Sequence, residues 1–117
     1  LADPSKQVVA VCGDGSFQMQ MMELATIMQE KIAVKIIVMR NNYLGMVREL
    51  QTKGYGDRLI AVDLDGSPDF VALARSYGIE ADRVVTMAEA EEKIDKLVNS
   101  DKPYLLECNV YKLESTL

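Results

Sequence analysis

Two short apolar runs, each followed closely by a polar turn, limit the folds open to this chain more than any other feature. Residues 8–12 (VVAVC) lead into the Gly-Asp-Gly turn at 13–15, and residues 34–39 (VKIIVM) lead into the Asn pair at 41–42. Both runs are rich in β-branched residues, which predicts buried strands. Residues 19–31 between them have apolar side chains at helical spacing. The segment therefore predicts a strand–helix–strand unit whose two strands lie parallel.

The polar residues that follow the two predicted strands point to a metal–diphosphate site. In open α/β folds, ligands bind at the carboxyl edge of the strands, where Asp14 and Asn41 would meet. Gly13 and Gly15 let the backbone approach a ligand closely, and a helix beginning near residues 16–20 would present free N–H groups to a phosphate. Asp14 would repel that phosphate unless a hard cation such as Mg²⁺ lay between them, with the Asn41 amide as a neutral ligand. The motif itself contains no general base and no nucleophile.

Other phosphate-binding motifs are absent from this segment. A dinucleotide-binding fingerprint needs a third glycine where the chain has Gln18, and no Gly-Lys-Ser/Thr sequence of a P-loop occurs. A receiver-type signalling module has the same α/β architecture but needs paired acidic residues after its first strand, whereas Asp14 stands alone there. The chain has no histidine, which excludes catalysis by His and zinc binding through His.

Composition and charge exclude several broader classes. The chain has 117 residues, which is enough for one small domain, and a net charge of −5 with scattered Lys and Arg, so no nucleic-acid footprint is present. No apolar run is long enough to span a membrane, so no membrane partner is expected. Cys12 and Cys108 fall in predicted strands and are interpreted as reduced, structural residues, which suits a cytoplasmic setting.

The remainder of the chain continues the alternation of strands and helices. This predicts a three-layer α/β/α fold with a mostly parallel sheet and a single domain over residues 1–117. Ser67 and Pro68 are interpreted as a helix start, Gly78 as a helix end, and Thr86 with Glu89 as a capping box. The other predicted elements are a helix at 43–52, a mobile loop at 53–57, a strand at 83–85, a helix burying Ala90, Ile94, Leu97 and Val98, and a strand at 104–110.

Four segments together resemble the large, catalytic subunit of acetolactate synthase, a thiamin diphosphate (ThDP)-dependent family. They are the Gly-Asp-Gly-Ser-Phe-Gln-Met run at 13–19, residues 23–26, the Asn-Tyr-Leu-Gly-Met-Val-Arg run at 42–48, and residues 65–70. The resemblance covers residues 8–110 and identifies the chain as the later part of a C-terminal ThDP-binding domain. It implies further strands upstream in the intact domain, so one edge of the sheet in this segment is expected to be incomplete.

The resemblance implies a role for particular residues. Asp14, the side chain of Asn41 and the backbone carbonyl of Tyr43 would bind Mg²⁺, which bridges to the diphosphate of ThDP. Met46, Val47 and Leu50 would line the substrate pocket, and no catalytic residue is implied. Anabolic members of the family usually have Trp at the position of Leu50, which helps favour 2-ketobutyrate as second substrate, so the preference here stays open. The residues implied to contact the cofactor, mostly through backbone atoms, are Gly13, Asp14, Gly15, Ser16, Asn41, Tyr43, Leu44, Gly45 and Met46.

The resemblance also implies what the whole enzyme does. It would decarboxylate pyruvate on ThDP and condense the two-carbon unit with a second 2-keto acid, in branched-chain amino acid biosynthesis. The family is cytoplasmic, works as a homodimer or tetramer with a possible small regulatory subunit, and carries FAD in a middle domain that this segment lacks. Its essential Glu comes from a partner subunit, so residues 1–117 alone are expected to be inactive. Other ThDP-dependent decarboxylases, oxidases and carboligases share the metal motif and remain the alternative.

Overall fold

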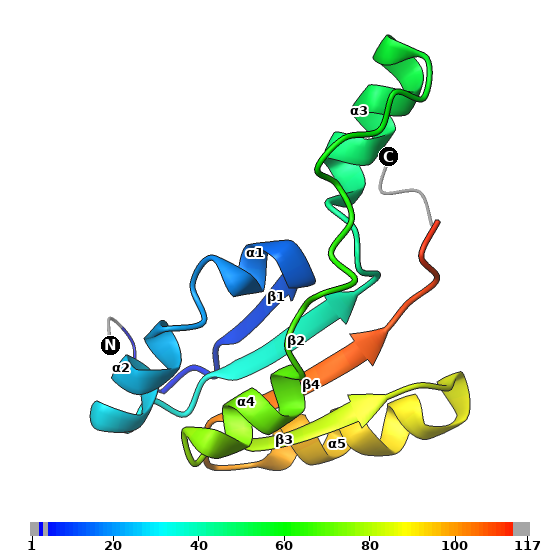
Figure 1. The fold of residues 1–117 in the computed structure, drawn as a ribbon. Helices are drawn as coiled ribbons and strands as arrows, with labels where there is room; N and C mark the ends of the chain where they lie inside the picture. The colour runs from blue at the N-terminus through cyan, green and yellow to red at the C-terminus, as the bar shows by residue number, and fades with distance from the viewer. Residues whose placement is uncertain (1–2, 4, 114–117) are drawn as a thin grey trace.

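Four parallel strands form one sheet in the computed structural model, which describes residues 3 and 5–113. Its spatial order is β1 (Val9–Gly13), β2 (Lys35–Arg40), β4 (Tyr104–Asn109) and β3 (Glu80–Val84) (Figure 1). This confirms the predicted mostly parallel α/β fold. β3 begins three residues earlier than the strand predicted at 83–85, and β4 ends one residue before 110.

The register of the sheet brings the two motif loops together. Gly13 at the end of β1 pairs with Met39 of β2, and Met39 pairs in turn with Cys108 of β4. Asp14 follows the first of these positions, and Asn41 lies two residues after the second. Both residues therefore lie at the carboxyl edge of the sheet, where the parallel strands end.

One face of the sheet carries the larger part of the core. The short helices α1 (Asp14–Gln18), α2 (Glu23–Gln29) and α4 (Phe70–Ser76) cover this face (Figure 1). Phe17 and Phe70 meet edge to face, with ring centroids 5.2 Å apart. The buried residues of this cluster are Phe17, Leu24, Ile36, Val38, Phe70, Val71, Ala74, Ile79, Ala81 and Leu105.

The opposite face is covered over β3 and β4 by α5 (Ala90–Asn99), which the 3₁₀ turn η1 (Met87–Glu89) precedes (Figure 1). The predicted capping box of Thr86 and Glu89 is confirmed. Leu97 is fully buried, but Ile94 and Val98 are about two-fifths exposed, at 42% and 43%, so the prediction that both are buried is wrong. The reason is that only the Leu97 side of α5 faces the sheet.

The strand that precedes Asp14 is exposed instead of buried. Val9 and Val11 are 43% and 65% exposed because β1 lies at the sheet edge and α5 does not cover it. The predicted burial of this strand is therefore wrong. Burial raises the thiol pKa of Cys12 in this strand and of Cys108 in β4, and both cysteines are free.

The helix predicted at 19–31 is shorter in the structure, and a separate short helix precedes it. α1 starts directly at Asp14, earlier than the predicted start at 16–20, and buries Phe17. The chain then turns through i to i+3 backbone bonds, in which Gln20 and Glu23 donate to the carbonyls of Phe17 and Gln20. α2 begins only at Glu23. Phe17 of α1 and Leu24 of α2 are both buried in the same core.

Two further helix boundaries differ from the sequence prediction. α3 (Gly45–Tyr55) continues into the predicted loop and ends at Gly56, whose φ of 59° is the left-handed conformation of a helix stop. Asp69, and not Ser67, caps α4, because the Asp69 side chain accepts a hydrogen bond from the Ala72 N–H at 2.9 Å. Gly78 after α4 has φ 82°, which confirms the predicted left-handed stop.

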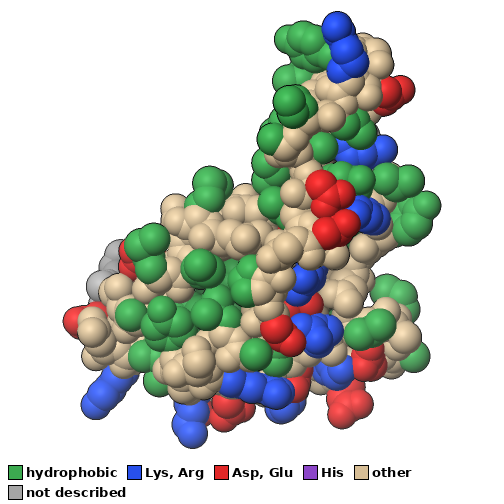
Figure 2. Space-filling view, viewed as in Figure 1, with side chains coloured by type: hydrophobic (Ala, Val, Ile, Leu, Met, Phe, Trp, Pro, Cys, Tyr) green, Lys and Arg blue, Asp and Glu red, His purple; other side chains and the backbone are tan. Residues whose placement is uncertain are grey.

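The helix α3 extends away from the sheet (Figure 1). Apolar side chains are exposed along it (Figure 2), among them Met46 and Leu50 at 68% and 62%. No helix in the described part of the chain is long and apolar enough to cross a membrane.

Candidate functional site

Asp14 connects the two loops at the carboxyl edge of the sheet. Its side chain is 1% exposed, although it is the first residue of a surface helix. One carboxylate oxygen, Oδ1, accepts a hydrogen bond from the Gly15 N–H at 2.9 Å, and the other, Oδ2, accepts one from the Asn42 N–H at 2.7 Å. Each carboxylate oxygen has more than one acceptor position, so both can still bind a cation.

The second loop is a tight turn shaped by its two asparagines. The Asn41 side-chain oxygen accepts a hydrogen bond from the Tyr43 N–H at 3.0 Å, which is an Asx turn. Asn42 has φ 57°, in the left-handed region that asparagine tolerates better than most residues. The turn directs the Asn42 N–H towards Asp14.

A segment distant in sequence holds this second loop. The Leu44 N–H donates to the Val62 carbonyl and the Leu64 N–H donates to the Asn42 carbonyl, both at 2.9 Å. Tyr43 and Asp63 form an antiparallel bridge between these bonds. This pairing is not predictable from the sequence, because an isolated bridge leaves no periodic pattern.

Gly15 allows the two loops to approach each other. A Cβ at this position would lie 2.5 Å from Leu44 Cδ2 and 3.3 Å from Leu64 Cδ1. The first distance is shorter than real Cβ contacts allow, so a side chain at position 15 would displace Leu44. This is the close approach that a glycine is expected to provide.

A cavity of about 600 Å³ opens beside these loops. The structure brings nearly all of the predicted site residues to it, and Leu50 is the exception among them. Met39 and Val110 also line it and were not predicted, although both lie at the carboxyl ends of strands, which is the signal that could have found them. The lining residues are Gly13, Asp14, Gly15, Ser16, Met39, Asn41, Tyr43, Leu44, Gly45, Met46, Val47 and Val110.

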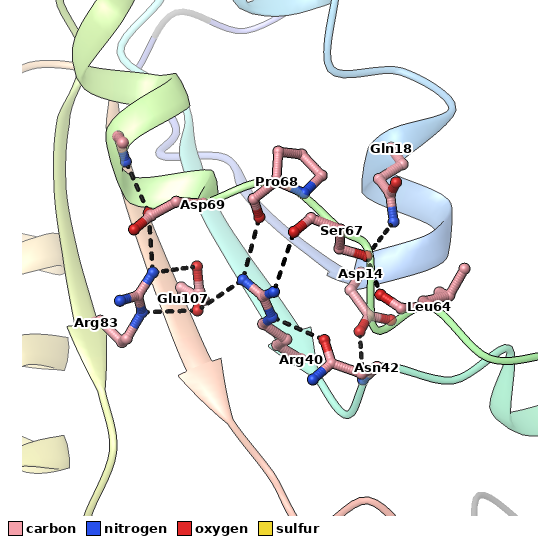
Figure 3. A network of polar contacts seen from close by, with 11 residues as sticks. Asp14, Gln18, Arg40, Asn42, Leu64, Ser67, Pro68, Asp69, Arg83 and Glu107 are labelled. Carbon is pink, nitrogen blue, oxygen red and sulfur yellow. Dashed lines mark hydrogen bonds and ion pairs between the residues drawn. The ribbon is translucent and has the colours of Figure 1, made fainter.

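A second group of polar residues lies next to the site and was also missed (Figure 3). Glu107 on β4 is 1% exposed and accepts two hydrogen bonds from Arg83, at 2.8 Å to Oε1 and 3.2 Å to Oε2. Arg40 donates to Glu107 Oε1 at 3.4 Å, and Arg83 also bonds Asp69 at 2.9 Å. Hydrogen bonding to Glu107 is the main cause of a raised Arg83 pKa. The pKa of Asp69 is lowered, chiefly by the Ala72 N–H and then by Arg83.

The donors at the first site suit a cation shared with a phosphate ligand. No cluster of three or more Asp, Glu, Cys or His side chains that could hold a metal occurs among residues 3 and 5–113. The site instead offers one buried carboxylate, one amide oxygen and neighbouring backbone carbonyls. Mg²⁺ typically takes one or two carboxylates and fills its other positions with water and phosphate oxygens. The residues present therefore fit a Mg²⁺–diphosphate group.

A parallel α/β sheet with this edge site is the architecture expected of a cofactor diphosphate-binding domain. Residues 1–108 match the family described as thiamine pyrophosphate enzyme, C-terminal TPP binding domain, and the chain belongs to this family. Thiamine pyrophosphate is the same compound as ThDP.

Within the family, the chain is similar to large subunits of acetolactate synthase. It is 45% identical over 107 residues to a "Probable acetolactate synthase large subunit" of Methanocaldococcus jannaschii, covering 92% of this chain and 18% of that protein. It is 36% identical over 115 residues to the acetolactate synthase isozyme 2 large subunit of Escherichia coli K12, covering 98% and 21%. The chain thus spans about a fifth of the length of these relatives.

A solved structure shares the fold at greater sequence distance. The ThDP-dependent 4-hydroxybenzoylformate decarboxylase of Rhodococcus jostii superposes with a TM-score of 0.86 at 29% identity. The match covers 97% of this chain and 21% of that one. The family, the relatives and this structure agree with the resemblance found in the sequence.

Proposed function

We propose that this chain is the diphosphate- and Mg²⁺-binding part of a ThDP-dependent acetolactate synthase. The observation that carries the proposal is the joining of the Asp14 and Asn41 loops beside one cavity, in a chain of the ThDP family. Asp14, Asn41 and the Tyr43 carbonyl are the proposed metal ligands. The chain's similarity to acetolactate synthase large subunits supports this assignment over other activities of the family.

The proposed task of these residues is to bind and orient the cofactor. When bound, ThDP supplies an electron sink for the carbanion that forms as a 2-keto acid loses CO₂. Asp14 would hold the metal end, Gly13, Gly15 and Ser16 would allow the backbone to approach the diphosphate, and Leu44 to Val47 would line the apolar part of the cavity. None of these groups is proposed to move a proton.

The complete protein is proposed to condense the two-carbon unit from pyruvate with a second 2-keto acid, in branched-chain amino acid biosynthesis. We further propose a cytoplasmic homodimer or tetramer, a possible small regulatory subunit, and FAD bound outside this segment. These proposals follow from the resemblance to the acetolactate synthase family, and the segment 1–117 is proposed to be one domain that is inactive by itself.

The test is product analysis with the purified complete protein, ThDP, Mg²⁺, FAD and pyruvate. Acetolactate is the expected product. Release of acetaldehyde without acetolactate would instead favour a decarboxylase, the second candidate function, which the structural similarity to the Rhodococcus jostii decarboxylase supports. The absence of acetolactate would contradict the assignment as an acetolactate synthase.

Leu50 allows a prediction about substrate choice. It does not line the cavity, but it lies four positions after Met46, which does, and therefore on the same face of α3. Leu50→Trp is expected to raise the preference for 2-ketobutyrate over pyruvate as acceptor by about 1–3 kcal/mol, because an added aromatic wall at the rim favours the larger substrate. A competition assay with both acceptors measures the product ratio.

The matched control for this variant is Tyr55→Trp, which adds an indole at the far end of the same helix. It is expected to leave the product ratio unchanged. An unchanged ratio in Leu50→Trp as well would remove Leu50 from the substrate pocket.

A further inference from the structure

Arg40 donates four side-chain hydrogen bonds at the carboxyl edge of the sheet, although it does not line the cavity. It is the last residue of β2, and its guanidinium lies 5.1 Å from the centre of the Phe70 ring. Its side chain is only 16% exposed. It does not line the cavity beside Asp14, so any effect on a ligand there must pass through another residue.

The guanidinium joins three separate segments (Figure 3). Nε donates to the Asn42 side-chain oxygen at 2.9 Å. Nη1 donates to the Pro68 carbonyl at 3.2 Å and to Glu107 at 3.4 Å, and Nη2 donates to the Ser67 carbonyl at 3.5 Å. Because the N–H groups of arginine point in fixed directions within one plane, these contacts together determine where the Asn42 side chain lies.

The contact with Asn42 matters because of the backbone at that residue. Asn42 has φ 57°, a conformation that costs energy for any residue other than glycine. Its N–H holds Asp14 Oδ2 at 2.7 Å, and its carbonyl accepts from the Leu64 N–H. A side-chain anchor that keeps Asn42 in this conformation therefore also keeps the Asp14 carboxylate in place.

The positive charge of Arg40 is neutralised by Glu107, which does not line the cavity. Glu107 is buried and is shared by Arg40 and Arg83, so the cationic group is held towards β4. Arg83 binds the same carboxylate, but its second side-chain partner is Asp69, whereas that of Arg40 is Asn42. The two arginines thus differ in whether they contact the Asn41–Asn42 turn.

We propose that Arg40 is a positioning residue for the metal–diphosphate site. Through the Asn42 side chain it fixes the left-handed turn whose N–H orients Asp14 and whose neighbours are Asn41 and Tyr43. This inference rests on the proposed function, because it takes Asp14 and Asn41 as metal ligands. It assigns a role in cofactor binding to a residue that touches neither the metal nor the cofactor.

The experiment measures binding of Mn²⁺ and ThDP to the complete protein without substrate. The variants are Arg40→Lys, Asn42→Ala and the double variant, with Arg83→Lys as the matched control that disturbs the same Glu107. Affinity is measured by titration, and the electron paramagnetic resonance spectrum of bound Mn²⁺ reports the geometry of its ligands. Thermal unfolding is recorded in parallel to separate stability from binding.

Arg40→Lys and Asn42→Ala are each expected to weaken binding about tenfold or more and to broaden the Mn²⁺ spectrum, because both remove the contact that holds the left-handed turn. The double variant should lose no more than the worse single variant, since effects of contacting residues are not additive. Arg83→Lys should lower the unfolding temperature with less than about a threefold change in affinity, as expected for a residue outside the turn.

The proposal is overturned if Arg40→Lys and Arg83→Lys weaken binding equally, or if the two effects add in the double variant. If Arg40→Lys does not fold, the Asn42→Ala variant alone tests the proposal, and unchanged affinity in that variant overturns it. Asp14→Asn, tested in the same titration, checks the proposed function separately. Unchanged binding in Asp14→Asn would reject the metal site itself, whatever the Arg40 variants show.

Discussion

Replacing Asp14 with Ala is expected to abolish Mg²⁺-dependent binding of ThDP to the complete protein. Among the described residues that line the cavity, Asp14 has the only carboxylate, and a diphosphate beside it needs a bridging cation. The same substitution removes both hydrogen bonds that orient Gly15 and Asn42. The affinity loss should exceed about 100-fold, because loss of a residue behind the direct ligands already costs about 10–100-fold at metal sites.

ThDP affinity is measured by calorimetric titration, with two control variants. Asn41→Ala should weaken binding less than Asp14→Ala, since a neutral ligand is lost and the carboxylate stays. Asp65→Ala removes an exposed carboxylate that contacts Lys112 outside the cavity, and it should leave ThDP affinity unchanged. Unchanged affinity in Asp14→Ala would show that the metal site has been assigned to the wrong residue.

The site could be foreseen because its main signals are local. A β-branched run followed by a glycine-flanked Asp, and a second run followed by an Asn pair, place both residues at one edge as soon as the strands are parallel. The sheet register brings the ends of β1 and β2 side by side. The remaining prediction, that these side chains hold Mg²⁺ and ThDP, depends on chemistry that titration will test.

The contacts that hold the site's loops in place could not be predicted from local sequence in the same way. The bridge between Tyr43 and Asp63 and the shared carboxylate of Glu107 join residues that are distant in sequence. One signal was available: Glu107 interrupts the apolar strand at 104–108, and a charge inside a buried strand needs a partner. The sequence does not say which arginine supplies it.

The errors in the predicted fold come from tertiary contacts that override local preference. Ser67 and Pro68 form a plausible helix start, yet their carbonyls accept hydrogen bonds from Arg40, and Asp69 takes the capping position. Val9 and Val11 form a typical buried strand by composition. Their exposure depends on the neighbours of β1, which local sequence does not specify.

Glu107→Gln is expected to lower the free energy of unfolding of the complete protein by about 3 kcal/mol, without removing a proposed ligand. The substitution keeps the shape of the side chain but leaves Arg83 and Arg40 without their shared negative charge, and breaking a buried ion pair costs about 3–5 kcal/mol. The lower value applies because water still reaches Arg83, which is 34% exposed, and can partly solvate its charge. Urea unfolding measures the change, and the exposed Asp95→Asn on α5 is the control, expected to stay within about 0.5 kcal/mol. Equal stability of the two variants would mean that Glu107 contributes only packing, and that Arg40 and Arg83 are held in place by their other contacts.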